Sequence, residues 1–382
     1  FSDMGHLLGS SSIEIWLQEG DVEKKIVFSG DVGNENQPII NVPQTVEEAD
    51  YVVMESTYGN RLHGPKPDYA PALAAILKET FDRGGNVVIP SFAVGRTQEM
   101  LYFLRQIKEE RLVPGYQDFP VYVDSPLANE ATRIFLQCDT ENFDQEMKDL
   151  IHRGVNPIWF DGLRISVSQQ DSMAINMDPS PKVILSASGM CEAGRIRHHL
   201  KHNLWRKECT ILFVGYQAVG TLGRSLCEGT KRVKLFDEEI AVEADIRQLP
   251  GISGHADRDG LVKWLQGFKE KPQQVFINHG DDDSCIAFTE LLTKEYGYRA
   301  AAPYSGAVFD LLAGCFVYDP AGVRVEQKVV MPLGSKAAAL FGGLLDAVRR
   351  LLGIAQSCQG RPNRDLKKFT AQVEKLCEEW EE

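Results

Sequence analysis

Residues 86–109 read NVVIPSFAVGRTQEMLYFLRQIKE, a short β-rich apolar run followed at once by a helical pattern. Val87, Val88 and Ile89 are consecutive apolar residues, which is typical of a strand that is buried on both faces. Over Gly95–Glu109 the apolar residues recur at helical spacing, so the predicted helix has one apolar face. A strand followed by such a helix is half of a βαβ unit, and this predicts a parallel sheet here.

The same alternation continues on the C-terminal side of this segment. The further strand-and-helix pairs are Val121–Val123 with Leu127–Leu136, Lys182–Leu185 with Gly194–Trp205, Thr210–Val214 with Thr221–Cys227, and Gln274–Asn278 with Cys285–Tyr296. Another strand pair is predicted within residues 233–246. Repeated pairs of this kind predict an α/β protein, because each helix returns the chain to start a parallel strand.

The two ends of the chain follow other patterns. Strands are predicted at Ile13–Leu17, Lys25–Phe28 and Tyr51–Met54, and the turn-rich stretch Gly59–Pro67 looks like a domain boundary. Near the C-terminus two amphipathic helices are predicted, separated by a break at Gln359–Asn363. Their apolar residues are Leu340, Phe341, Leu344, Leu345, Val348, Leu351 and Leu352, then Leu366, Phe369, Val373, Leu376 and Trp380. We expect this helical appendage to pack on the body or on a partner.

Composition narrows the classes of protein further. The 382 residues are too many for one ordinary domain, and 43% apolar with 25% charged residues excludes a disordered chain. The net charge of −13 argues against non-specific coating of nucleic acid but leaves room for a local basic groove. No apolar run approaches the roughly 20 residues that span a bilayer, and no signal peptide opens the chain. The 8 cysteines form no C-x-x-C pair, which suits a reducing cytoplasm.

Five polar residues stand where α/β proteins place their sites. Asp31, Glu55 and His279 each follow an apolar strand, and His6 and His255 lie in glycine-flanked loops. Imidazole nitrogen and carboxylate oxygen are ligands of Zn²⁺. Each residue alone is also typical of a turn or a helix cap, and no H-E-x-x-H is present. These residues are therefore consistent with a metal hydrolase, but by themselves they do not distinguish it from a protein in which they are turn and cap residues.

The order of the motifs resembles the β-CASP family of metallo-β-lactamase-fold nucleases. FSDMGHLLGS at 1–10 and FSGD at 28–31 resemble its third and fourth metal motifs. ESTYG at 55–59, SGHAD at 253–257 and HG at 279–280 resemble its motifs A, B and C. Further matching segments are PSFAVGRTQE at 90–99, DSPLA at 124–128, SGM at 188–190 and GYQAVGTLGR at 215–224. The resemblance runs from residue 1 to about 325, and it is strongest to the RNA-processing branch, which includes the cleavage-and-polyadenylation endonuclease and its prokaryotic relatives.

The resemblance implies a fold and its division into domains. It implies a metallo-β-lactamase αββα sandwich over residues 1–60 and 254–325, an inserted parallel-sheet β-CASP domain over 61–253, and a C-terminal helical extension over 326–382. The family's His-x-His-x-Asp-His motif and the aspartate motif before it are absent, so we expect the N-terminal part of the sandwich to be missing. We therefore expect this chain alone to be inactive and aggregation-prone, with an exposed apolar patch flanking Ile13, Ile15 and Val27.

The resemblance also implies roles for the five polar residues. Two zinc ions would be held, with His6 on one, His279 on the other and Asp31 between them. A metal-bound water would attack the phosphorus, while His255 would donate a proton to the leaving oxygen and Glu55 would orient His255. The products would be a 5′-phosphate and a 3′-hydroxyl, and the sequence leaves endonuclease and exonuclease action both open.

Five further residues are candidates for binding RNA phosphates on the strength of the family match. They are Arg96, Ser188, Gly189, Arg195 and Arg224, of which Arg195 opens a run of basic residues that extends to Lys207. The competing interpretations are internal salt bridges for the arginines, a tight turn for Ser188 and Gly189, and a solvated helix face for the basic run.

The resulting hypothesis is a zinc-dependent ribonuclease that hydrolyses single-stranded RNA in the cytoplasm. The alternative is a non-catalytic RNA-binding or scaffold subunit, although the five motif positions present carry competent side chains. A DNA nuclease is disfavoured by His279, because RNA-directed members carry histidine at motif C. A small-molecule metallohydrolase is disfavoured by the β-CASP insert. We expect RNA as partner, no membrane, and either a homodimer or an RNA-processing complex.

Overall fold

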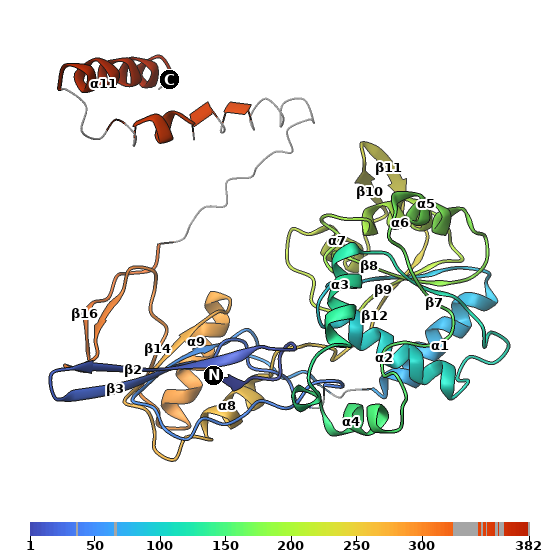
Figure 1. Ribbon diagram of the computed structural model, residues 1–382, viewed down its shortest axis with the longest axis horizontal. Helices are drawn as coiled ribbons and strands as arrows, with labels where there is room; N and C mark the ends of the chain where they lie inside the picture. Colours follow the sequence, from blue (N-terminus) through green and yellow to red (C-terminus); the bar gives the residue numbers. More distant parts are fainter. Residues whose placement is uncertain are drawn as a thin grey trace. The chain divides into compact units, whose positions relative to one another are not determined.

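The computed structural model describes residues 1–35, 37–64, 67–323, 343–344, 347–348, 350–355, 358 and 363–380. The chain divides into two compact units, Phe1–Ala321 and Gly322–Glu382. The first unit contains two six-stranded sheets, which form two lobes in Figure 1. Helices alternate with parallel strands through most of it, so the predicted α/β class is confirmed.

The second sheet along the chain is parallel throughout. Its strands stand in the order β12-β9-β5-β8-β6-β7, and every neighbouring pair is parallel. Their bounds are β5 Val87–Pro90, β6 Val121–Val123, β7 Leu163–Ile165, β8 Val183–Ser186, β9 Thr210–Phe213 and β12 Asp245–Gln248. The 86–109 segment thus supplies one of the two central strands, as its unbroken apolar run indicates.

Helices cover both faces of this sheet. Their bounds are α1 Tyr69–Asp82, α2 Arg96–Glu109, α3 Pro126–Phe135, α4 Gln145–His152, α5 Gln169–Met177, α6 Ile196–Asn203 and α7 Leu222–Cys227, with a short 3-10 turn η1 at Thr140–Asn142. Val87 and Ile89 belong to one core with α1 and α2, whereas Val88 belongs to the core formed with α6 and α7. Alternating side chains of one strand fill both cores, because successive residues point to opposite faces.

The first sheet combines a hairpin with parallel strands. The order is β1-β2-β3-β4-β13-β14, with bounds β1 Ser2–Asp3, β2 Ser11–Glu19, β3 Val22–Phe28, β4 Tyr51–Glu55, β13 Gln274–Asn278 and β14 Ala300–Ala301. Strands β3, β4 and β13 run parallel, so their carboxyl ends meet at one edge. Helices α8 (Arg258–Leu265) and α9 (Asp282–Lys294) pack on one face, against Val27, Val52 and Val275.

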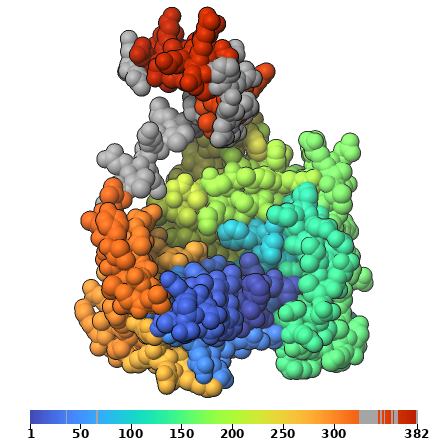
Figure 2. Space-filling view, turned by 60° about the vertical axis from the view of Figure 1, so that its left-hand side comes forward, coloured from blue at the N-terminus to red at the C-terminus, as the bar shows by residue number. Residues whose placement is uncertain are grey.

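The opposite face of this sheet is only partly covered. Phe309 and Phe316 of the hairpin β15–β16 (Val308–Asp310 and Cys315–Tyr318) pack edge-on against Phe276. Ile13 and Ile15 of β2 remain 42% and 38% exposed. Figure 2 shows these first strands (blue) at the surface, beside the orange segment that contains β15 and β16.

The expected apolar patch is therefore present at Ile13 and Ile15 but does not include Val27. Ile13 pairs with Phe28 and Ile15 with Ile26, so these four side chains share the outer face. Val27 lies between Ile26 and Phe28 in the strand, points to the other face and is fully buried. Ile26, Val27 and Phe28 are all apolar, so the sequence alone does not show which of them faces the core.

Other elements meet or refine the sequence predictions. The strand pair expected within residues 233–246 is the hairpin β10 (Arg232–Leu235) and β11 (Glu238–Ala241), and β12 follows it. Helix α11 (Asn363–Glu378) is the second predicted C-terminal helix. The first lies partly outside the described residues, as do Leu340, Phe341 and most of the predicted break. Among the helices of the described part, none has the length and apolarity needed to cross a membrane.

Candidate functional site

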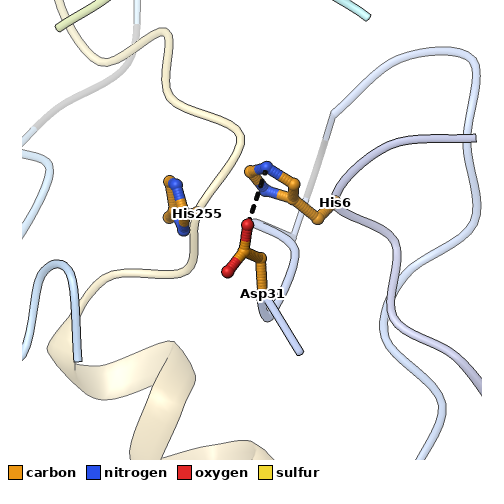
Figure 3. Close-up of side chains that lie close together, drawn as sticks. All are labelled: His6, Asp31 and His255. Atoms are coloured by element: carbon orange, nitrogen blue, oxygen red, sulfur yellow. Dashed lines mark ion pairs between the residues drawn. The ribbon is translucent and has the colours of Figure 1, made fainter. Parts of the chain in front are cut away.

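Two histidines and one aspartate converge at the carboxyl edge of the first sheet. His6 Nε2 lies 3.7 Å from Asp31 Oδ2, and His279 Nδ1 lies 3.3 Å from Asp31 Oδ1. Figure 3 shows His6 and His255 flanking the Asp31 carboxylate. The two carboxylate oxygens of Asp31 thus face two different imidazoles, which is the arrangement that a bridging ligand requires.

The parallel register of the strands explains this convergence. Asn278 of β13 stands opposite Glu55 of β4, so the residues after both strands emerge side by side. Asp31 follows β3 at the same edge, and the loop between β1 and β2 carries His6. His279 adopts a positive φ of 47°, which turns the chain sharply after the strand and leaves its ring beside Asp31.

Close packing of backbone holds the loops of the site together. A Cβ atom on Gly33 would lie 2.0 Å from the carbonyl oxygen of Gly5, and the Gly33 N–H donates to the Met4 carbonyl at 2.7 Å. A Cβ atom on Gly254 would lie 2.9 Å from Cε1 of His6. Position 33 requires glycine because the close contact there is with backbone, whereas a side chain at position 254 would displace the ring of His6.

His255 and Glu55 form a second, partly buried pair beside Asp31. His255 Nδ1 lies 3.0 Å from Oε1 and 3.1 Å from Oε2 of Glu55. Burial alone would lower the pKa of His255, but the hydrogen bond and charge of Glu55 outweigh it, so the pKa is raised. Burial would raise the pKa of Glu55, but bonds from His255, Thr57 and the Val32 N–H hold that pKa below its usual value. The pair therefore favours an imidazolium next to a carboxylate.

His6 has the opposite electrostatic character. Burial, followed by the nearby charge of His255, lowers the pKa of His6. Its ring centroid lies 4.3 Å from that of His255. A neutral imidazole is the form that binds a metal ion, whereas a protonated one donates a proton. The two neighbouring histidines are thus set for different tasks by their surroundings.

The residues present fit a metal ion. His6, Asp31 and His255 offer ligand atoms that all lie within 4.8 Å of one another, and so do Asp31, Glu55 and His279. Asp31 belongs to both groups. Within the described part of the chain, its ion-pair partners are His6 and His279, so no lysine or arginine there neutralises it. Nitrogen and oxygen donors at this spacing suit Zn²⁺.

Two of the predicted phosphate-binding arginines form ion pairs on helices of the second sheet. Arg96 forms an ion pair with Glu99 and is largely buried. Arg224 lies 2.6 Å from Glu228 on its own helix, and this exposed i,i+4 pair raises the pKa of the guanidinium. Their contact with phosphate stays a prediction, and it would have to compete with these carboxylates.

Arg195 belongs to a network around the fully buried Asp124. Its guanidinium lies 2.7 Å from Asp124 Oδ1, while His199 Nε2 lies 2.7 Å from Oδ2. Ser172 also donates to this carboxylate, at 2.5 Å. Burial would raise the pKa of Asp124, but these bonds hold it far below its usual range. Two residues of the basic run, Arg195 and His199, thus have a structural role as partners of Asp124. The RNA contact of Arg195 stays a prediction.

Ser188 and Gly189 form a turn at the end of β8. The Ser188 hydroxyl accepts from the Glu192 N–H at 3.2 Å, and the Gly189 carbonyl accepts from Gln217 Nε2 at 3.0 Å. A Cβ on Gly189 would lie 3.1 Å from the ring of Phe92, which is 47% exposed. The turn therefore joins three loops at the carboxyl edge of the second sheet, and its contact with phosphate stays a prediction.

Sequence reasoning missed the residues that follow Glu55. Thr57 Oγ1 lies 3.2 Å from His279 Nδ1, and His63 Nε2 lies 2.8 Å from the carbonyl oxygen of His255. The Arg61 guanidinium lies over the ring of Tyr58. Thr57 and Tyr58 stand in the ESTYG segment and Arg61 and His63 in the turn-rich stretch after it, and neither pattern predicts a role for these side chains.

Comparison with known proteins matches two regions of the chain. Residues 97–226 match the Beta-Casp domain, and residues 239–303 match the Zn-dependent metallo-hydrolase RNA specificity domain. The first region covers most of the parallel sheet, and the second contains His255 and His279. The chain belongs to the β-CASP family. The resemblance inferred from the motifs is thereby confirmed, together with the fold class.

Several curated proteins are similar to this β-CASP chain. A protein of Thermus thermophilus named ribonuclease is 36% identical over 76% of the chain and 64% of its own length. The transcription termination factor FttA of Methanosarcina mazei is 32% identical over 77% of the chain and 47% of its length. An RNase J-like protein of Methanocaldococcus jannaschii is 28% identical over 81% and 70%. The chain spans about half to two-thirds of the length of the first two.

Proposed function

We propose that the site hydrolyses phosphodiester bonds of single-stranded RNA with the help of bound zinc. The observation that carries the proposal is the position of Asp31, whose two oxygens face His6 and His279 while the His255–Glu55 pair stands beside it. The match to a Zn-dependent RNA specificity domain and the similarity to a protein named ribonuclease support it. Two metal ions sharing one carboxylate is a common design for phosphoryl hydrolysis.

The chain's own residues divide the work in this proposal. His6 and His279 would each hold one ion and Asp31 would bridge them, and the bound metal supplies Lewis-acid stabilisation of charge on the phosphoryl oxygens. His255 holds a proton on the side away from Glu55 and donates it to the leaving oxygen. Glu55 fixes the ring of His255 and supports its charge. A water molecule adds to the phosphorus as the bond to the 3′ oxygen breaks, so the products are a 5′-phosphate and a 3′-hydroxyl.

Zinc binding is the first test of this proposal. Zinc is titrated into the metal-free chain, and bound metal is measured after desalting for the native protein, Asp31→Asn and the exposed control Asp21→Asn. We expect Asp31→Asn to lose zinc and Asp21→Asn to retain it. Equal zinc in all three proteins would contradict the assigned ligands.

Cleavage of RNA is the second test. A 5′-labelled single-stranded RNA is incubated with excess protein and zinc, and products are resolved by length and end chemistry. The proposal assigns three ligands, His6, Asp31 and His279, to two ions, so we expect this chain alone to be inactive or to turn over very slowly. RNA binding with two zinc ions bound per chain and no cleavage at any protein concentration would favour the alternative, a non-catalytic RNA-binding subunit.

A further inference from the structure

A cation lies between two tyrosine rings at the mouth of the site. The Arg61 guanidinium carbon lies 4.4 Å from the ring centroid of Tyr58 and 5.8 Å from that of Tyr216. Tyr58 and Arg61 follow β4 of the first sheet, whereas Tyr216 follows β9 of the second. The contact therefore joins loops from the two sheets, at distances where arginine and an aromatic face attract each other.

This array begins at the proposed proton donor. The ring of Tyr58 lies 6.4 Å from that of His255, and it also packs edge-on against His63 at 4.6 Å. His63 in turn contacts the His255 carbonyl. The side chains of Tyr58, Arg61 and Tyr216 thus form a line that leads outward from His255.

Arg61 differs from the arginines that the sequence motifs single out. Arg96, Arg195 and Arg224 each form an ion pair with a carboxylate of the same chain. Within the described residues, no ion pair involves Arg61. Its side chain is exposed, and Tyr216 is 45% exposed beside it. A guanidinium without a carboxylate partner keeps its N–H groups available for an anion.

We propose that Arg61 and Tyr216 form a binding subsite for one nucleotide of single-stranded RNA, next to the scissile phosphate. The edge of the Arg61 guanidinium donates hydrogen bonds to a phosphate, and the open face of Tyr216 stacks on the base. This inference rests on the proposed function, since the subsite is placed by its distance from His255. A base in a duplex is already stacked on its neighbours, so the subsite selects single strands.

The backbone around Arg61 is fixed independently of its side chain. The Arg61 carbonyl accepts from the Arg258 N–H at 3.1 Å, and its own N–H donates to the Tyr58 carbonyl at 3.1 Å. Both bonds persist when the side chain is changed, so Arg61 variants are expected to keep the loop in place. A matched control exists in Arg164, which lies 5.5 Å from the ring of Tyr122 on strands β6 and β7.

The test is equilibrium binding without cleavage. A fluorescein-labelled single-stranded RNA is titrated with the chain in EDTA buffer at several salt concentrations, and the dissociation constant is read from anisotropy. We expect Arg61→Gln to weaken binding about tenfold and to reduce the slope of log affinity against log salt by about 0.7, the value for one phosphate contact. Tyr216→Leu should weaken binding about 5- to 100-fold, as expected for one stacked base, while Tyr216→Phe retains affinity.

The remaining outcomes separate the subsite from the proposed function. Arg164→Gln should bind RNA like the native chain, and melting temperatures verify that each variant is folded. If the native chain binds RNA and the Arg61 and Tyr216 variants bind equally well, the subsite is wrong while the proposed function stands. If the folded native chain binds no RNA, both are wrong. A duplex RNA that binds as tightly as the single strand would also overturn the subsite.

Discussion

Both carboxylate oxygens of Glu55 lie within hydrogen-bond range of one nitrogen of His255, at 3.0 and 3.1 Å. Glu55 comes from the end of β4 and His255 from the loop before α8, 200 residues apart along the chain. This contact leaves the other ring nitrogen of His255 free to face a substrate. In the proposed function Glu55 is accordingly the positioning residue and His255 the proton donor.

The first prediction concerns this pair. In a protein with the complete ligand set and bound zinc, His255→Ala is expected to reduce the rate of RNA cleavage by about 10²–10⁴, the usual contribution of a positioned proton donor. Glu55→Gln should give a smaller loss, because the ring remains in place but loses the charge that supports its protonated form. Single-turnover rates under excess zinc measure both, with zinc content checked in parallel. An unaffected His255→Ala variant would remove His255 from the mechanism.

The second prediction concerns the kind of nucleic acid. In a protein with the complete ligand set and bound zinc, single-stranded RNA should be cut, whereas DNA of the same sequence should be spared or cut poorly. The comparison uses matched oligonucleotides that differ only in the 2′-hydroxyl, the group by which a protein distinguishes RNA from DNA. Equal rates on the two substrates would contradict the assignment to the RNA branch, which was based on histidine at position 279.

The third prediction concerns metal stoichiometry. Three ligands shared between two ions leave each ion with fewer than the four that a closed zinc shell needs, so zinc should bind weakly or at a single site. His279→Ala should weaken binding further, since it removes the group opposite the second oxygen of Asp31. Calorimetric titration gives both affinity and number of sites. Two tight zinc ions per native chain would show that further ligands exist.

The fourth prediction concerns the stability of the β-CASP region as pH falls. The pKa of Asp124 is lowered in the folded chain, so its contribution is complete above the ordinary carboxyl pKa of about 4 and is lost as the pH drops below that value. Asp124→Asn leaves Arg195 and His199 without their acceptor and should cost about 3–5 kcal/mol at neutral pH.

Thermal unfolding between pH 3 and 7 measures this effect. The difference in melting temperature between the native chain and Asp124→Asn should begin to shrink below about pH 4, because the unfolded native chain then binds a proton that the folded chain, with its lowered Asp124 pKa, excludes. The exposed Asp139→Asn serves as control and should follow the native curve. A constant difference across the range would mean that Asp124 does not act through its ionised form.

The fifth prediction concerns the loop that carries His6. Gly33→Ala would bring a Cβ to 2.0 Å from the Gly5 carbonyl oxygen, so the backbone before His6 must move. We expect a loss of about 1–3 kcal/mol in stability and weaker zinc binding. Gly215→Ala is the control, since a Cβ there would meet no atom within 4 Å. Unchanged zinc affinity in Gly33→Ala would show that the loop adapts without moving His6.

The sequence determined those features that depend on local pattern. The apolar run at 87–89 and the helical spacing after it were sufficient to predict the strand β5 and the helix α2. A strand buried on both faces has consecutive apolar residues, whereas a helix buried on one face has apolar residues every three or four positions. Asp257 directly precedes helix α8, the place where aspartate is favoured as a cap, and its Oδ1 accepts from the Gly260 N–H at 3.0 Å. The motif order was also sufficient to propose His6, Asp31 and His279 as one site.

Only the tertiary structure decided which charges are free and which faces are covered. The sequence does not distinguish Arg195 from Arg61. In the structure Arg195 donates to Asp124, 71 residues away along the chain, whereas Arg61 lies against tyrosines that follow strands of two different sheets. Val27 and Ile15 are both apolar strand residues, and the register places one in the core and one at the surface. Such outcomes depend on contacts between distant segments, and no local spacing encodes them.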